Sequence, residues 1–92
     1  MNVENEIKRI IIDVLNLDVT PEELASNTPL LDGGLELNSL LGLNIILRVE
    51  EHFDFEIEVG DLERDVLTDI KHFADFVRRK HQKRQTNFSS ME

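Results

Sequence analysis

Ser39 is the residue of this sequence best placed to do chemistry. It lies in the stretch LLDGGLELNSLLGLNIILRVEEHF (residues 30–53), after a loop with two glycines and before a long apolar run. The first turn of a helix has unpaired backbone N–H groups and a partial positive charge. A serine there can cap the helix, or its hydroxyl can carry a phosphate that the same groups stabilise. On spacing alone the helix cap is the favoured interpretation, because such caps are common at helix starts.

The neighbours of Ser39 suit a displayed hydroxyl. Gly33 and Gly34 allow the loop to turn away sharply, which leaves the hydroxyl clear for an incoming enzyme. Leu40 and Leu41 follow directly and provide an apolar surface for that enzyme to contact.

Other motifs favour ordinary structural interpretations. His52, His72 and His81 lack the spacing of metal ligands and are interpreted as surface histidines. The acidic run 54–65 lacks the ligand spacing and central glycine of a calcium loop, and no phosphate-loop motif surrounds the two glycines. We therefore expect no metal site and no catalytic triad.

The charge of the chain is unevenly distributed. Residues 1–77 carry 18 acidic and 5 basic side chains, whereas residues 78–92 carry 5 basic and 1 acidic. The acidic body argues against nucleic acid and anionic membrane as partners and favours partners with basic patches. The basic cluster is interpreted as cations that complement a helix C-terminus.

Composition and length predict one small cytoplasmic domain. The 92 residues suffice for a single domain, and the absence of cysteine fits a reducing cytosol. No basic, apolar targeting segment begins the sequence, and no apolar run approaches the roughly 20 residues that span a bilayer. We expect a soluble monomer.

The apolar spacing predicts three main helices. The first covers 3–17 with Asn2 as its cap, a long irregular loop follows over 18–38, and the second helix covers 39–53. The apolar stripe of the second helix runs through Leu43, Ile46, Val49 and Phe53, and further apolar residues widen it beyond one face: Leu40, Leu41, Ile45 and Leu47. Such a helix is either buried nearly all round or exposes a patch to a partner.

The second half of the chain is expected to contain one more long helix. Residues 53–59 alternate like a strand but have no partner strand, so we predict an extended connector that points Phe55, Ile57 and Val59 inward. A short helix is expected over 60–66, and Thr68 is expected to cap a last helix ending near Arg79. We therefore predict a folded domain over 1–80 and a disordered basic tail over 81–92.

These elements, in this order, resemble the acyl carrier protein family of phosphopantetheine-binding proteins. The resemblance rests on L-L-D-G-G-L-E-L-N-S-L, on the helix that ends V-E-E-H-F, and on the following F-E-I. It covers nearly the whole folded part. It implies an all-α, acyl-carrier-like bundle of three main helices plus one short helix, with a long loop between the first two helices.

The resemblance also implies a function. Ser39 would receive a 4′-phosphopantetheine arm from coenzyme A, on which a stand-alone carrier holds an acyl or aminoacyl group as a thioester and catalyses nothing itself. The implied partners are a phosphopantetheinyl transferase and acyl-activating, acyl-transfer or condensing enzymes. The residues expected to contact these partners are Asn38, Leu40, Leu41, Leu43, Asn44, Leu47, Glu50 and Glu51.

The sequence departs from the family pattern around this serine. Asn38 replaces the usual aspartate, Leu41 and Asn44 stand where fatty-acid carriers tend to have carboxylates, and Arg48 adds a positive charge. We therefore expect more apolar recognition and a specialised lipid or secondary-metabolite pathway. The alternative function is an unmodified interaction module of the same fold that docks through its apolar second helix.

Overall fold

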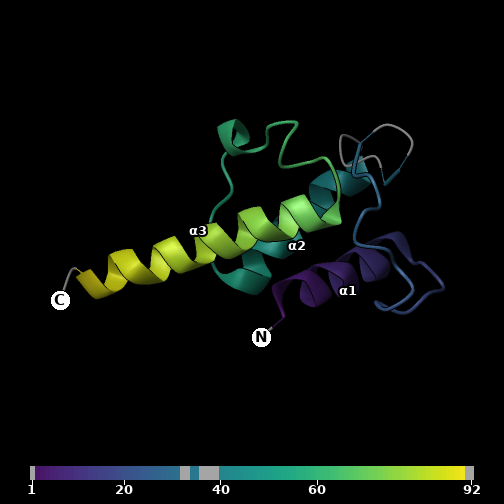
Figure 1. Ribbon diagram of the computed structural model, residues 1–92, viewed down its shortest axis with the longest axis horizontal. Helices are drawn as coiled ribbons and strands as arrows, with labels where there is room; N and C mark the ends of the chain where they lie inside the picture. The colour runs from purple at the N-terminus through teal and green to yellow at the C-terminus, as the bar shows by residue number, and fades with distance from the viewer. Residues whose placement is uncertain (1, 32–33, 36–39, 91–92) are drawn as a thin grey trace.

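Three α-helices form the framework of the protein. The computed structural model describes residues 2–31, 34–35 and 40–90, and within them the elements are α1 (Val3–Leu15), α2 (Leu40–Phe53), the 3-10 helix η1 (Val59–Asp61) and α3 (Ile70–Ser90). α1 packs against both α2 and α3, and Figure 1 shows α2 passing behind α3. No strand occurs among the described residues, and the predicted all-α fold is confirmed.

The core lies where the three helices meet. Apolar side chains from each helix interlock there, as the 3.6-residue period of α1 and α3 predicts. Loop residues complete the cluster. Its buried members are Val3, Ile7, Ile10, Ile11, Leu24, Leu30, Ile45, Val49, Phe53, Phe55, Ile70, Phe73, Ala74, Phe76 and Val77.

Polar residues close both ends of α1. The side chain of Asn2 accepts a hydrogen bond from the Asn5 backbone N–H at 3.0 Å, so the predicted cap is confirmed. The prediction that this helix reaches residue 17 is wrong, because Asn16 adopts a left-handed conformation (φ 54°) and ends the helix at Leu15. Asparagine tolerates this conformation better than most residues.

The long loop between α1 and α2 is fastened to the start of α3. The backbone N–H groups of Ile70 and Lys71 donate to the carbonyls of Thr28 (3.2 Å) and Ser26 (2.9 Å). These bonds satisfy donors that the first turn of a helix otherwise leaves unpaired. Leu24 and Leu30 belong to this loop, and their side chains are buried in the core. The loop is therefore a packed part of the domain rather than a free linker.

The alternating segment after α2 is an extended connector, as predicted. Asp54 takes a left-handed conformation that ends α2, after which Phe55 is buried and Ile57 half-buried, while Glu56 and Glu58 are exposed. The side chain of Val59 lies outside the described part. The predicted short helix is present as a 3-10 helix, and only its predicted bounds, 60–66, are wrong. A 3-10 turn forms at Val59–Asp61, and a separate turn closes through the Leu67 N–H on the Glu63 carbonyl at 3.1 Å.

Asp69 caps α3, and the prediction of Thr68 is wrong. The Thr68 hydroxyl donates to the Arg64 carbonyl at 3.1 Å, whereas Asp69 Oδ1 accepts the His72 backbone N–H at 2.9 Å and lies 2.6 Å from its ring Nδ1. Partial burial opposes ionisation of Asp69, but the two bonds from His72 outweigh it and hold the pKa of this carboxyl below its ordinary value.

The last helix is longer than expected. We expected it to end near Arg79, but α3 continues to Ser90 and extends past the packed body in Figure 1. No glycine or proline interrupts residues 80–90, and Lys, Arg and Gln have good helix propensity. The division of the chain into a domain over 1–80 and a disordered basic tail over 81–92 stays a prediction.

Candidate functional site

Two of the predicted site residues, Asn38 and Ser39, lie outside the described residues. The nearest described residues in sequence are Leu35 before them and Leu40 after them. Leu40 is the first residue of α2, so Ser39 directly precedes the helix in sequence. The loop that ends at Leu35 and the helix that begins at Leu40 are the described parts of the chain next to the site.

The loop before the site turns tightly at Gly34. A Cβ atom on Gly34 would lie 1.9 Å from the carbonyl oxygen of Pro29, which is far inside van der Waals contact. That same carbonyl accepts the Leu35 backbone N–H at 2.9 Å, and the Gly34 N–H donates to Leu31 at 3.0 Å. The sequence predicted that glycine allows the loop to turn sharply here. The structure gives the reason at Gly34, where the Pro29 backbone leaves no space for a side chain. Gly33 lies outside the described residues.

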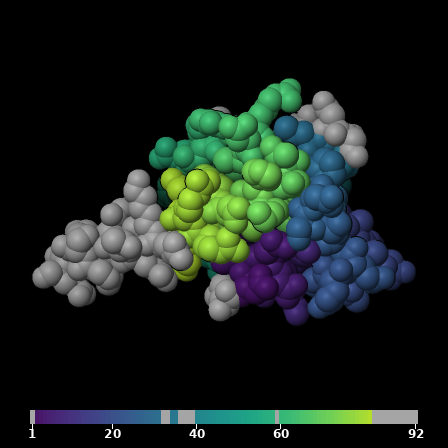
Figure 2. Space-filling view, viewed as in Figure 1, coloured from purple at the N-terminus to yellow at the C-terminus, as the bar shows by residue number. Residues whose placement is uncertain are grey.

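The helix after the site exposes a ridge of leucines. We call Leu40, Leu41, Leu43 and Leu47 the leucine ridge; their exposed fractions are 80%, 49%, 51% and 48%. The opposite face of α2 is buried in the domain. Figure 2 shows the molecular surface from the side where α3 lies in front. An exposed apolar patch of this kind is typical of a surface that contacts a partner.

The predicted apolar stripe of α2 is wrong at two residues, Leu43 and Ile45. The spacing placed Leu43 in line with the core residues and Ile45 outside that line, whereas Leu43 is half exposed and Ile45 is fully buried. The buried stripe starts at Gly42, which has no side chain and so gives no apolar signal in sequence. The buried residues of α2 are Gly42, Ile45, Ile46, Val49 and Phe53.

The electrostatic character of α2 changes along its length. No acidic residue lies in its first turn, so the positive end of the helix dipole is not compensated by a carboxylate from the helix itself. Farther along, Arg48 pairs with Asp13 of α1 at 2.8 Å, and His52 lies 2.9 Å from Glu6 of α1. The start of α2 is thus apolar and favourable to an anion, while its second half is tied to α1.

The two acidic residues predicted to contact partners differ in environment. Glu51 is exposed, as is Asn44. Glu50 is half-buried, and its Oε2 accepts the backbone N–H of Ile57 at 2.6 Å. That bond fastens the connector to the end of α2, so Glu50 has a structural role that sequence inspection missed. Its contact with partners stays a prediction.

Replacing Glu50 with Ala is expected to destabilise the protein more than replacing Glu51 with Ala. The Glu50→Ala change leaves the Ile57 N–H without its charged acceptor and should cost about 2 kcal/mol of unfolding free energy. The Glu51→Ala change removes an exposed side chain and should stay within about 0.5 kcal/mol. Urea titration followed by circular dichroism measures both, and equal losses would contradict the structural role of Glu50.

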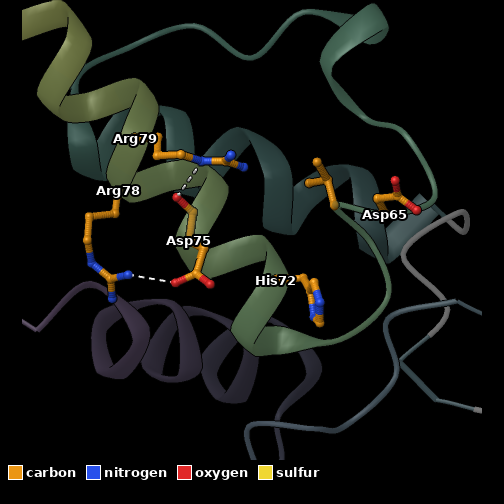
Figure 3. A pocket seen from close by; sticks show the side chains of 6 residues that line it. Asp65, His72, Asp75, Arg78 and Arg79 are labelled. Carbon is orange, nitrogen blue, oxygen red and sulfur yellow. Dashed lines mark hydrogen bonds and ion pairs between the residues drawn. The ribbon is translucent and has the colours of Figure 1, made fainter.

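A hollow lies between α3 and the segment before it, and its lining residues are Asp65, Val66, His72, Asp75, Arg78 and Arg79. In Figure 3 the Arg78 side chain reaches the Asp75 carboxylate, to which its Nη1 donates at 2.7 Å, and Arg79 Nε donates to the backbone carbonyl of Asp75 at 3.3 Å. Within the part of the chain that the structure describes, no three His, Cys, Asp or Glu side chains gather as metal ligands. No described helix has the length and hydropathy required to cross a membrane.

Comparisons with known proteins agree on one family. A family model described as "Phosphopantetheine attachment site" matches residues 5–77. The acyl carrier protein of Buchnera aphidicola subsp. Schizaphis graminum is 37% identical over 82 residues, covering 89% of this chain and 98% of the relative. That of Chlamydia felis is 37% identical over 76 residues, covering 77% and 94%. The solution structure of a holo acyl carrier protein from Nitrosomonas europaea is 30% identical with a TM-score of 0.72, covering 87% and 96%.

Proposed function

Because this chain belongs to the acyl carrier protein family of phosphopantetheine-binding proteins, we propose that Ser39 is its attachment site and that it serves a specialised lipid or secondary-metabolite pathway. The chain is a carrier and not an enzyme, and its cofactor is a covalently attached 4′-phosphopantetheine. Its partners include, in general, a phosphopantetheinyl transferase and enzymes of acyl metabolism.

The observation that supports Ser39 is the exposed start of α2. Leu40, its neighbour in sequence, is 80% exposed although it is a leucine, and the first turn of α2 contains no carboxylate. A phosphodiester at this point would meet unpaired N–H groups and the positive end of the helix dipole. The described residues therefore fit a phosphate-linked arm at the residue before Leu40.

Different parts of the chain have different roles in the proposed carrier function. The arm supplies a thiol that holds the acyl group as a thioester. The tight turn at Gly34 and the start of α2 present the attachment residue, and the leucine ridge gives partner enzymes an apolar surface to bind. The domain itself moves no proton and breaks no bond.

The composition of the exposed face supports a specialised pathway. Leu41 and Asn44 are exposed and uncharged, and farther along α2 the exposed residue Arg48 is basic. A partner that recognises this face relies on apolar contact more than on a row of salt bridges. Acyl-activating, acyl-transfer or condensing enzymes with an apolar groove are the partners that we propose. The cytoplasmic location and the monomeric state stay predictions.

The intact mass of the protein tests the proposal. The protein is incubated with coenzyme A and a broad-specificity phosphopantetheinyl transferase, and its mass is measured before and after. A gain of one phosphopantetheinyl group supports the carrier function. No gain with transferases of several kinds would contradict it and favour the unmodified interaction module.

Replacing Asn38 with Asp should speed this modification. The substitution restores a negative charge beside the attachment residue, where the family usually has an aspartate, and a nearby charge changes the rate of encounter with a basic partner. We expect kcat/KM of the transferase to rise about threefold, the effect of roughly 0.7 kcal/mol from one exposed charge pair. Equal rates at low ionic strength would show that this charge is irrelevant.

A further inference from the structure

A cluster of cations on α3 has no role in the proposed carrier function. We call its five residues the basic stretch: Arg78, Arg79, Lys80, Lys83 and Arg84. The sequence predicted that these cations complement the C-terminal end of a helix. However, α3 continues to Ser90, and its last turn contains no basic residue. The basic stretch therefore lies inside a continuous helix, where the negative end of the helix dipole does not stabilise it.

Two of its first three cations are compensated within the protein. Arg78 Nη1 lies 2.7 Å from Oδ1 of Asp75, one turn earlier in α3. Lys80 Nζ lies 3.2 Å from Oδ2 of Asp61 in η1. A carboxylate at hydrogen-bond distance cancels much of the field that each cation would otherwise present to a partner. These two residues are therefore engaged before any partner arrives.

Arg79, between them, keeps its positive charge available. Its Nε donates to the Asp75 backbone carbonyl at 3.3 Å, and it forms no ion pair with any described residue. The side chain is exposed and lines the hollow of Figure 3 together with Asp65, with which it makes no ion pair either. The bond to the carbonyl orients the guanidinium, and its Nη groups can donate to both oxygens of an incoming carboxylate.

The positive charge continues along the helix beyond Arg79. Lys83 and Arg84 belong to α3 and follow Arg79 and Lys80 by four residues each. Positions four residues apart are neighbours on a helix, so these four positions form one strip. Like charges at this spacing repel one another, and no acidic residue occurs over 78–90 to relieve them. An anionic partner would remove that repulsion.

We propose that the basic stretch binds an acidic segment of a partner protein, a section of chain rich in aspartate and glutamate. One carboxylate of the segment pairs with the guanidinium of Arg79, and the next ones follow the strip toward residue 84. Clusters of basic residues, arginine above all, recognise acidic motifs in this way. The start of α2 and the end of α3 lie at opposite ends of the molecule in Figure 1. The proposed site is therefore separate from the attachment residue and goes beyond the carrier function.

The charge of the rest of the chain favours a short protein segment over other anions. Residues 1–77 carry 18 acidic and 5 basic side chains, a net charge of −13. An extended polyanion such as nucleic acid, or an anionic membrane, would meet this acidic body as well as the basic stretch and be repelled by it. A second copy of the chain carries the same net charge of −9 and is also repelled. A short acidic segment can contact α3 alone, where the helix extends past the packed body.

The test uses a short fluorescein-labelled peptide of alternating glutamate and serine. The full chain is titrated into it and fluorescence anisotropy is measured at about 0.1 M salt, where a Debye length of about 10 Å screens the acidic body and preserves direct contacts. The peptide should bind. Arg79→Gln should raise Kd about threefold, the effect of one exposed charge pair. The double variant Lys83→Gln, Arg84→Gln should raise Kd roughly tenfold, the effect of two such pairs.

Arg9→Gln is the matched control. It changes the net charge as Arg79→Gln does and also removes an exposed arginine, whose side chain is 65% exposed, but it lies on α1. It should leave Kd unchanged. Glutamine has good helix propensity, so the variants should retain α3, and circular dichroism verifies this. A peptide of alternating glutamine and serine should not bind.

The proposal is overturned if the acidic peptide fails to bind, or if Arg9→Gln weakens binding as much as Arg79→Gln. It is also overturned if a labelled single-stranded oligonucleotide or a phosphatidylglycerol vesicle binds more tightly than the peptide, since the partner would then be a polyanion or a membrane. Sedimentation equilibrium that shows a dimer dependent on Arg79 would assign the stretch to a second copy. The carrier function is judged separately, by the mass of the protein after incubation with coenzyme A and a transferase.

Discussion

Replacing Ser39 with Ala is expected to abolish loading completely while the fold survives. Alanine has no hydroxyl to accept the phosphopantetheinyl group, so no other change in the protein can compensate. The structural cost is expected to be at most that of a lost helix cap, about 1 kcal/mol of unfolding free energy. Intact mass after incubation with coenzyme A and a transferase measures the loading, and circular dichroism verifies the helices.

Ser26→Ala is the appropriate control for this experiment. The Ser26 hydroxyl donates to the Glu4 carboxylate, which is also paired with Lys8 at 3.5 Å, so Ser26 has a structural partner. The variant should lose some stability and still gain one group. A full mass gain in the Ser39→Ala protein would show that another hydroxyl is the acceptor and would refute the assignment.

Replacing Gly34 with Ala is expected to have a large effect on stability. The added Cβ would lie 1.9 Å from the Pro29 carbonyl oxygen, so the backbone of the loop must move, and the bond from the Leu35 N–H to that oxygen moves with it. Overpacking of this kind costs about 2 kcal/mol. In a domain of this size the loss lowers Tm by about 10 °C.

Gly60→Ala provides the matched control for that change. A Cβ on Gly60 would meet no atom within 4 Å, so this substitution should change the unfolding free energy by less than about 0.5 kcal/mol. Thermal unfolding followed by circular dichroism compares the two variants. If both have the same Tm, the close approach at Gly34 does not constrain the loop.

The Gly34→Ala variant should also be loaded more slowly. The loop that turns at Gly34 leads within a few residues to Ser39, and it is fastened at its other side to the start of α3 through Thr28 and Ser26. A displaced turn therefore changes how the attachment residue is presented, even at temperatures where the helices remain folded. We expect kcat/KM of the transferase to fall with Gly34→Ala and to stay constant with Gly60→Ala.

Features that depend on neighbours in sequence were predictable from the sequence. The buried face of α1, the Asn2 cap and the buried residues of α3 all follow from a helical period or from contacts three residues apart. The alternation over 53–59 likewise placed Phe55 and Ile57 inward. The motif around Ser39 named the family, although Ser39 itself lies outside the described residues.

Features that depend on distant partners were not predictable in this way. Thr68 and Asp69 are both good cap residues. Asp69 caps α3 in the structure, and its backbone also forms a bridge with Pro29 in the loop packed against α3. Glu50 and Glu51 are identical neighbours, but only Glu50 faces the returning connector.

The sequence by itself determined the family and the buried faces of α1 and α3, but not which face of α2 exposes the leucine ridge. Only the tertiary structure decided how the charges beside that ridge act. Asp13 and Arg48 are 35 residues apart, and no local pattern links them. Their pairing exists because the packing of α1 against α2 brings the two side chains together, and it changes Arg48 from an unmasked cation into half of an ion pair.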